Sequence, residues 1–253
     1  MQVILIGSGN IARLMGRLLL KKGHIIQQVW SRQEAHAASL AKELNAVPVT
    51  DLAHVAKTAD IYIVAVTDDA LPFLTAQLSV NDKLVIHTSG TAPLDILKHC
   101  STAYGVLWPI KMVRSSADTL SPATLFIDGN TPAVIESIRG VAALFSENIT
   151  TGDDDKRARM HLAATFTTNF SNHLFHLAAD FCKKEGLSFS NLYPLIESAV
   201  LQIKDHDPAD LQAGPAFRGD LLAIQKHLQL LENEPQMIKI YNVTTESIVQ
   251  SRK

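Results

Sequence analysis

Residues 2–12 decide the fold of this chain, and they read Gln2-Val3-Ile4-Leu5-Ile6-Gly7-Ser8-Gly9-Asn10-Ile11-Ala12. An apolar run of strand length leads into a glycine turn and then into the spacing of an amphipathic helix. Between a strand and a helix, the pattern G-x-G-x-x-[G/A] is typical of dinucleotide binding. Gly7 would permit the tight turn, Gly9 would admit a pyrophosphate, and Ala12 would let helix and strand pack closely. The predicted cofactor contacts here are Gly7, Ser8, Gly9, Asn10 and Ile11, although a glycine turn without a ligand would have the same sequence.

The first 150 residues or so alternate short apolar, β-branched runs with longer amphipathic ones. Strands are predicted at 3–6, 25–30, 61–66, 84–87 and 104–107, with weaker candidates at 47–49, 125–128 and near 149. Helices are predicted at 10–22, 33–44 and 132–145. This alternation predicts an α/β, Rossmann-like domain with a mainly parallel sheet, spanning residues 1–152.

The pattern changes after residue 152, because only helical periodicity is found over residues 153–253. An acidic start at Asp153 predicts a helix that runs without interruption to Gly186, and further helices are expected at 191–204, 220–231 and 235–249. The first of these would be about 45 Å long, at about 1.5 Å per residue, which exceeds what a small domain needs for its own core. We therefore expect an all-α domain that forms a homodimer through this helix.

The end of the second predicted strand bears on the choice of cofactor. An NAD site would normally carry a carboxylate there, whereas this chain has Ser31-Arg32. A hydroxyl and a guanidinium could bind a 2′-phosphate, so NADP is the expected cofactor. A solvated loop arginine is the alternative for Arg32.

Three further loops should lie at the carboxyl ends of strands, where ligands bind in open α/β sheets. Val66 ends the third clear strand and Thr67 follows it, while Thr88 and Ser89 follow the next strand, so all four are predicted cofactor contacts. Helix capping by Asp68 and a plain connecting turn are the alternatives. In the third loop Lys111 could donate a proton or bind an anion, although the sequence favours an exposed loop lysine.

Polar residues recur at spacings of three and four along the long helix, at His161, Thr165, Asn169, Asn172 and His176. Such a row among apolar neighbours needs hydrogen-bond partners, which a substrate cleft or a packed helical seam could supply. His161 and Asn169 are the catalytic candidates on this row.

A separate motif, at residues 214–220, places an arginine in a turn between two helices. Arg218 could hold a substrate carboxylate or phosphate, or it could pair with a structural acid, with Gly219 and Asp220 ending and capping helices.

Composition excludes several classes of function. With 23 basic and 25 acidic residues and a formal net charge of −2, the chain has no nucleic-acid footprint. Apolar runs are too short for a membrane span or a signal-peptide core, and Cys100 and Cys182 favour a reducing compartment, so we expect a cytoplasmic protein. No metal site is expected, because His173 and His176 lack a third ligand.

Together these motifs resemble the NADP oxidoreductases that join a Rossmann-like N-terminal domain to an uncharacterised helical C-terminal domain. The resemblance covers nearly the whole chain and rests on Gly7-Ser8-Gly9-Asn10-Ile11-Ala12, Ser31-Arg32, His87-Thr88-Ser89-Gly90, His161-Leu162-Ala163-Ala164, Asn169-Phe170 and Gly214-Pro215-Ala216-Phe217-Arg218-Gly219-Asp220. It extends to deazaflavin-dependent NADP oxidoreductases, pyrroline-5-carboxylate reductases and hydroxyacid dehydrogenases. It implies a helical dimer that reduces a C=O or C=N bond.

The chain departs from these relatives at two positions. Their third loop usually reads Pro-hydrophobic-Gln-Thr/Ser-Phe, and here Lys111 replaces the glutamine. The Lys-x-x-x-Asn pattern of hydroxyacid dehydrogenases would align with Thr165 to Asn169, so its lysine is absent, which weakens the expectation of hydroxyacid chemistry.

The sequence thus predicts an NADP-dependent oxidoreductase that moves a hydride between NADP(H) and a small polar or anionic C=O or C=N substrate, with a deazaflavin as an open possibility. The alternative is an NADP(H)-binding sensor or scaffold without turnover.

Overall fold

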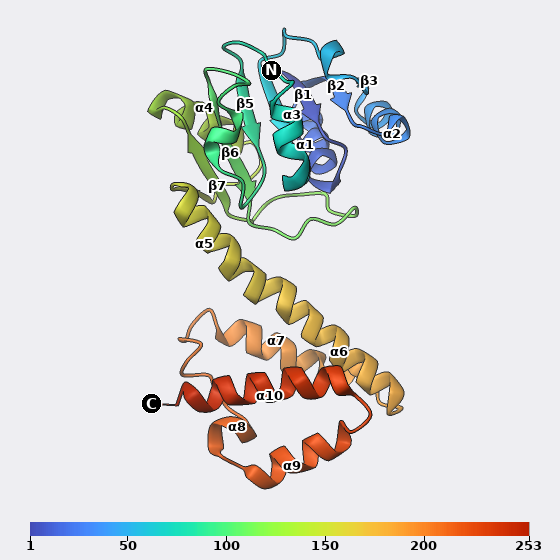
Figure 1. Ribbon diagram of the computed structural model, residues 1–253, viewed down its shortest axis with the longest axis vertical. Helices are drawn as coiled ribbons and strands as arrows, with labels where there is room; N and C mark the ends of the chain where they lie inside the picture. The colour runs from blue at the N-terminus through green and yellow to red at the C-terminus, as the bar shows by residue number, and fades with distance from the viewer. Residues whose placement is uncertain (253) are drawn as a thin grey trace. The chain divides into compact units, whose positions relative to one another are not determined.

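The computed structural model describes residues 1–252, which form two compact units (Figure 1). The first unit covers residues 1–169 and the second begins at residue 170. The sheet ends at Thr151, next to the domain boundary predicted at residue 152. The helix that follows the sheet, α5 (Asp154–Ala164), lies within the first unit. The boundary at residue 152 therefore stays a prediction about domains, while the change from sheet to helix is confirmed.

The first unit contains one eight-stranded sheet in the order β3-β2-β1-β4-β5-β6-β7-β8. Its strands are β1 (Gln2–Ile6), β2 (Ile25–Trp30), β3 (Val47–Val49), β4 (Ile61–Val64), β5 (Leu84–His87), β6 (Tyr104–Pro109), β7 (Leu125–Gly129) and β8 (Ile149–Thr151). Strands β1 to β6 are parallel, β7 is antiparallel to β6, and β8 is parallel to β7. The mainly parallel, Rossmann-like prediction is confirmed, with the order reversing direction at β1 as in dinucleotide-binding folds.

Helices cover both faces of this sheet because successive strand residues point to opposite sides. Val3 and Leu5 pack in the core shared with α1 (Asn10–Lys21), α2 (Glu34–Leu44) and α4 (Pro132–Ala142). Ile4 and Ile6 pack on the other face with α3 (Leu71–Thr75), a five-residue helix that is too short for sequence periodicity to predict.

The helix that begins after the sheet is capped as the sequence predicts, since the Asp153 carboxylate accepts a hydrogen bond from the Lys156 backbone N–H at 2.8 Å. It continues from α5 through a π-helical segment, Thr165–Phe170, into α6 (Ser171–Lys184). The helix is uninterrupted, as predicted, but those six residues have π-helical rather than α-helical geometry. Hydroxyls at Thr165 and Thr168 donate to the carbonyls of the preceding turn, at His161 and Ala164, which weakens the regular ladder.

The described part of the second unit contains helices joined by turns and no strand, as the sequence predicts. Its remaining helices are α7 (Tyr193–Gln202), α8 (Pro215–Arg218), α9 (Leu221–Leu230) and α10 (Pro235–Gln250). The turn predicted around Arg218 is the short helix α8, which ends at Gly219 with a φ of 76°. Asp220 caps α9 by accepting from the Ala223 N–H at 3.0 Å. Within residues 1–252, no helix is both long and apolar enough to span a bilayer.

Candidate functional site

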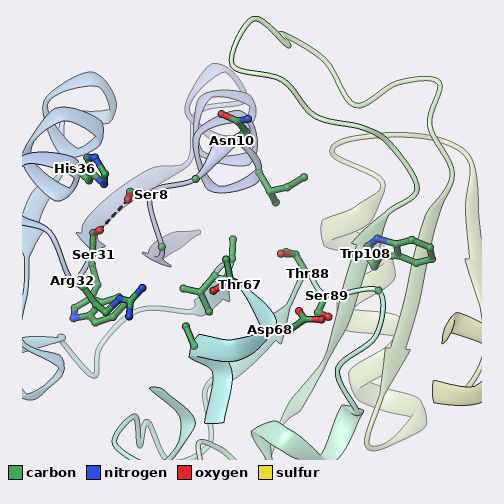
Figure 2. Close-up of a pocket in the computed structure, with 18 of the residues that line it drawn as sticks. Ser8, Asn10, Ser31, Arg32, His36, Thr67, Asp68, Thr88, Ser89 and Trp108 are labelled. Atoms are coloured by element: carbon green, nitrogen blue, oxygen red, sulfur yellow. Dashed lines mark hydrogen bonds between the residues drawn. The ribbon is translucent and has the colours of Figure 1, made fainter. Parts of the chain in front are cut away.

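A cavity of about 860 Å³ lies at the carboxyl ends of β1, β2, β4 and β5, where the strand order reverses. All the residues predicted to contact the cofactor line it, namely Gly7, Ser8, Gly9, Asn10, Ile11, Ser31, Arg32, Val66, Thr67, Thr88 and Ser89. Figure 2 shows Ser8, Ser31, Arg32 and His36 at one end of this cavity and Thr88, Ser89 and Trp108 at the other. The fold thus brings the predicted residues together in one elongated space.

The two glycines of the turn serve different purposes. Gly7 has a φ of 123°, and a Cβ there would lie 2.2 Å from the Ala65 carbonyl oxygen, so the fold itself requires glycine. A Cβ on Gly9 would meet no atom within 4 Å. The fold therefore leaves the space beside Gly9 open, which is where a pyrophosphate would approach the backbone.

The N-terminus of α1 is free to bind an anion. Gly9 is its N-cap, no side chain caps it, and its first turn holds no acidic residue. The Asn10 side chain is directed elsewhere, because its amide donates to the Val113 carbonyl at 3.1 Å. The unpaired N–H groups and the helix dipole are what phosphate binding at a helix N-terminus requires.

At one end of the cavity the Ser8 hydroxyl donates to Ser31 at 3.0 Å, and this bond holds the glycine turn against the end of β2 (Figure 2). Arg32 is exposed and makes no hydrogen bond or ion pair with any residue of the described chain. His36, in the first turn of α2, lines the same end. The sequence analysis missed His36, although its position four residues after Arg32 at a helix start could have indicated it.

The loop after β5 is fixed by a buried histidine. His87 is fully buried, and its Nδ1 accepts from the Ser89 N–H at 3.2 Å, which places the proton of the neutral ring on Nε2. Burial, with the nearby Arg157, lowers the pKa of His87 from 6.5 to about 4. The unfolded chain would bind this proton as the pH falls from 6.5 toward 4 while the folded chain does not, so His87 makes the fold less stable across that window.

The turn after His87 is closed by its own hydroxyls. Ser89 Oγ accepts from the backbone N–H groups of Thr91 and Ala92 at 3.1 and 2.9 Å. The Asp68 carboxylate accepts a hydrogen bond from the Thr91 hydroxyl. Asp68 therefore fastens two loops together, whereas the sequence analysis considered it as a helix cap.

Arg157 links α5 to the same loop, and the sequence analysis did not identify it. Its side chain is fully buried, donates to the Ala92 carbonyl and to Asp154 Oδ1, and lies 4.0 Å from the Asp128 carboxylate. Asp154 in turn accepts from the Leu94 N–H at 2.9 Å. Burial is the main cause that raises the pKa of Asp128. The start of α5 is thus held against the segment that follows the cofactor loop.

One turn beyond Arg157, His161 packs on that loop. A Cβ on Gly90 would lie 2.3 Å from His161 Cδ2 and 2.9 Å from Trp108 Cε2, so only glycine fits beneath these rings. The ring centroids of Trp108 and His161 are 5.5 Å apart. Both residues line the large cavity at its Thr88–Ser89 end.

A second cavity of about 230 Å³ shares Trp108 and His161 with the first. It is enclosed by the loop of residues 109–112, which carries Lys111, and by the helical face that carries Thr165, Thr168 and Asn169. Three of the four predicted catalytic residues, Lys111, His161 and Asn169, therefore lie around one small space.

The other members of the predicted polar row, Asn172 and His176, lie on α6 in the second unit. His176 Nε2 lies 3.5 Å from the Asp180 carboxylate. Arg218, the fourth candidate, is exposed on α8 in the same unit. Its role in holding a substrate anion stays a prediction.

Comparisons with known proteins identify two matching family models. The model described as NADP oxidoreductase, coenzyme F420-dependent, matches residues 2–90, and a domain of unknown function, DUF2520, matches residues 123–248. No curated protein matches the chain.

Three solved structures align with nearly the whole chain. A protein from Bacteroides fragilis described as a "putative NADP oxidoreductase" is 32% identical, with a TM-score of 0.90 and 98% of each chain covered. An imine reductase from Myxococcus stipitatus in complex with NADP+ is 17% identical, with a TM-score of 0.70, covering 99% of this chain and 94% of the other. A reductive aminase from Aspergillus terreus in complex with NADPH and ethyl-5-oxohexanoate is 17% identical, with a TM-score of 0.74 and the same coverage.

Proposed function

Because the chain belongs to the NADP oxidoreductase family that includes the Bacteroides fragilis protein, we propose that it transfers a hydride between NADP(H) and the C=O or C=N bond of a small polar or anionic substrate. The chain is an oxidoreductase with NADP as its cofactor, and the alternative of a sensor without turnover is set aside. The observation that carries the proposal is the junction of the two cavities at Trp108 and His161, where a cofactor space and a smaller space meet.

The residues around the large cavity fit the cofactor. Gly9 and the uncapped start of α1 would hold the pyrophosphate, and Ser31 and Arg32 would hold the 2′-phosphate. With these ends fixed, the Thr88–Ser89 end of the cavity receives the nicotinamide, which supplies the hydride when bound. Trp108 and His161 then shield the reacting carbon from water.

His161 is our candidate for the proton donor because it lines both cavities. Its ring is held by Trp108 on one side and by the Gly90 backbone beneath it. A second space of about 230 Å³ favours a small substrate over a three-ring deazaflavin. Cys100 and Cys182 are free and buried, which supports a reducing compartment such as the cytoplasm.

The cofactor assignment can be tested at Arg32. Arg32→Ala should weaken NADPH binding by about 10- to 100-fold and leave NADH binding unchanged, because a charge-assisted contact is lost only where the 2′-phosphate exists. His36→Ala should act in the same direction with a smaller effect, since His36 lines the same end. Calorimetric titration of both cofactors measures this, with the exposed Lys57→Ala as control. Equal losses for NADPH and NADH would contradict the assignment.

We also propose that the second unit forms a homodimer, because it leaves many of its large apolar residues exposed. Helices α7, α9 and α10 contain no buried residue, and Leu222 and Val243 are 80% and 69% exposed. Apolar surface of this extent marks an interface, and a second copy is the partner that covers it without any further protein.

Light scattering on the purified chain tests the dimer. The expected mass is twice that of the chain at micromolar concentration, and Leu222→Asp should reduce it because a charge in an apolar interface is costly. Gln77→Asp adds the same charge at a polar, exposed position of the first unit and serves as control. A wild-type mass of one chain would rule the dimer out.

A further inference from the structure

We infer that the second cavity binds a carboxylate through Lys111, so that the substrate is a short-chain oxo or imino acid; this rests on the proposed hydride transfer at the same site. Lys111 is the single lysine or arginine among the residues that line the cavity, and no carboxylate accompanies it there.

The ammonium of Lys111 is oriented and has donors to spare. Its Nζ donates one hydrogen bond, to the Thr119 carbonyl at 2.8 Å, and an ammonium has three N–H groups. Among residues 1–252 it makes no ion pair. A cation that is half-buried, held at one point and without a counter-charge is suited to an anionic ligand group.

The opposite wall of the cavity offers further donors. Thr168 Oγ1 lies 2.9 Å from the side-chain amide of Asn169, and its one proton is donated to the Ala164 carbonyl at 2.6 Å. The Asn169 amide therefore presents one N–H group to Thr168 Oγ1, and its second N–H group remains to donate into the cavity that both residues line. Lysine and amide donors together match the two oxygens of a carboxylate.

The size and place of the cavity limit the rest of the substrate. At roughly 30 Å³ per water molecule, about 230 Å³ has room for a carboxylate and a few further heavy atoms. The reducible carbon has to reach the nicotinamide end of the large cavity, which begins at Trp108 and His161. Carboxylate and reducible carbon are therefore separated by a short chain.

Reduction of such a substrate adds one hydride and one proton to its C=O or C=N bond. The carbonyl or imine carbon accepts a hydride from NADPH, its π electrons move to oxygen or nitrogen, and that atom takes one proton from the His161 side. NADPH becomes NADP+, and the oxo acid becomes a hydroxy acid or the imino acid an amino acid. The carboxylate on Lys111 does not react, so it contributes positioning alone.

The test compares an acid with its uncharged ester. 4-Oxopentanoate and its ethyl ester are titrated by calorimetry into the full-length protein saturated with NADP+, which holds no hydride. Wild type should bind the acid about 10- to 100-fold more tightly than the ester. Lys111→Met should remove this preference, Lys111→Arg should retain most of it, and Lys57→Met should leave it intact. Asn169→Asp adds a carboxylate to the cavity and should weaken binding of the acid but not of the ester.

Equal binding of acid and ester by wild type, or an acid preference that survives Lys111→Met, would overturn the carboxylate site. A parallel assay follows NADPH oxidation with 4-oxopentanoate and pyruvate, with and without ammonium, and with their ethyl esters. Oxidation of NADPH with acids and esters alike would also overturn the carboxylate site, yet it would leave the proposed hydride transfer standing. Acid binding that depends on Lys111, without NADPH oxidation, would support the site and count against the hydride transfer.

Discussion

Gly9→Ala is expected to leave the protein as stable as wild type while weakening NADPH binding by about 100-fold, or about 2.7 kcal/mol. In the protein alone the added methyl group would meet no atom within 4 Å, and Gly9 has an ordinary φ of −73°. The methyl group would, however, occupy the space that a pyrophosphate needs beside the helix N-terminus. The expected loss is therefore confined to the bound state.

Two other glycines serve as controls for this substitution. Gly140→Ala is also free of clashes but lies in α4, away from the cavity, so it should retain NADPH affinity. Gly7→Ala should lower stability as well as affinity, because its Cβ would collide with the Ala65 carbonyl oxygen. Thermal melts and NADPH titrations on the three variants separate these cases. Unchanged NADPH affinity in Gly9→Ala would place the pyrophosphate elsewhere.

Arg157→Met should lower the free energy of unfolding by about 2 to 4 kcal/mol, because it removes a buried cation from between Asp154, Asp128 and the Ala92 carbonyl. We expect this loss of stability to be smaller than for a fully buried ion pair, since the Asp154 side chain is 45% exposed and water can solvate it. For a unit of the size of residues 1–169, this loss should lower the melting temperature by roughly 10 °C.

The matched control is Arg159→Met, two residues along the same helix. Arg159 pairs with Asp155 at 3.1 Å, and both side chains are more than 80% exposed, at 82% and 83%. Exposed pairs of this kind contribute little, so the control should melt close to wild type. If both variants lost the same stability, the loss would come from shortening an arginine on this helix rather than from the buried network.

The sheet and the glycine turn could be predicted because their signals are local. The alternation of apolar runs predicted every strand of the sheet, and Gly7 and Gly9 stand in the strand-turn-helix context that gives them meaning. Where a strand ends earlier than predicted, the residues that follow it take another conformation. The third clear strand ends at Val64 rather than at residue 66, because Val66 and Thr67 turn away to line the cavity.

The linkage around Arg157 could not be predicted in the same way. Its partners Ala92 and Asp128 are 65 and 29 positions away along the chain, and nothing in the sequence near Arg157 marks it as buried. An acidic residue three positions earlier is as typical of an exposed helix start. The π-helical segment was missed for a related reason, because apolar spacing alone does not register hydroxyls that compete for backbone carbonyls.

The candidate site was predicted in its parts rather than as a whole. Lys111, His161 and Asn169 were each singled out from residue type and spacing, and the fold places them around one cavity. This cavity adjoins the larger one through Trp108, because the end of β6 and the first turns of α5 meet at Gly90. This meeting is a tertiary contact, which sequence periodicity does not contain.

The most direct test of the account is a crystal structure of the protein in complex with NADP+. The account predicts the pyrophosphate at Gly7–Gly9, the 2′-phosphate at Ser31 and Arg32, and nicotinamide C4 facing the junction of the cavities at Trp108 and His161. A nicotinamide directed away from that junction, or a 2′-phosphate without contact to Arg32, would contradict it.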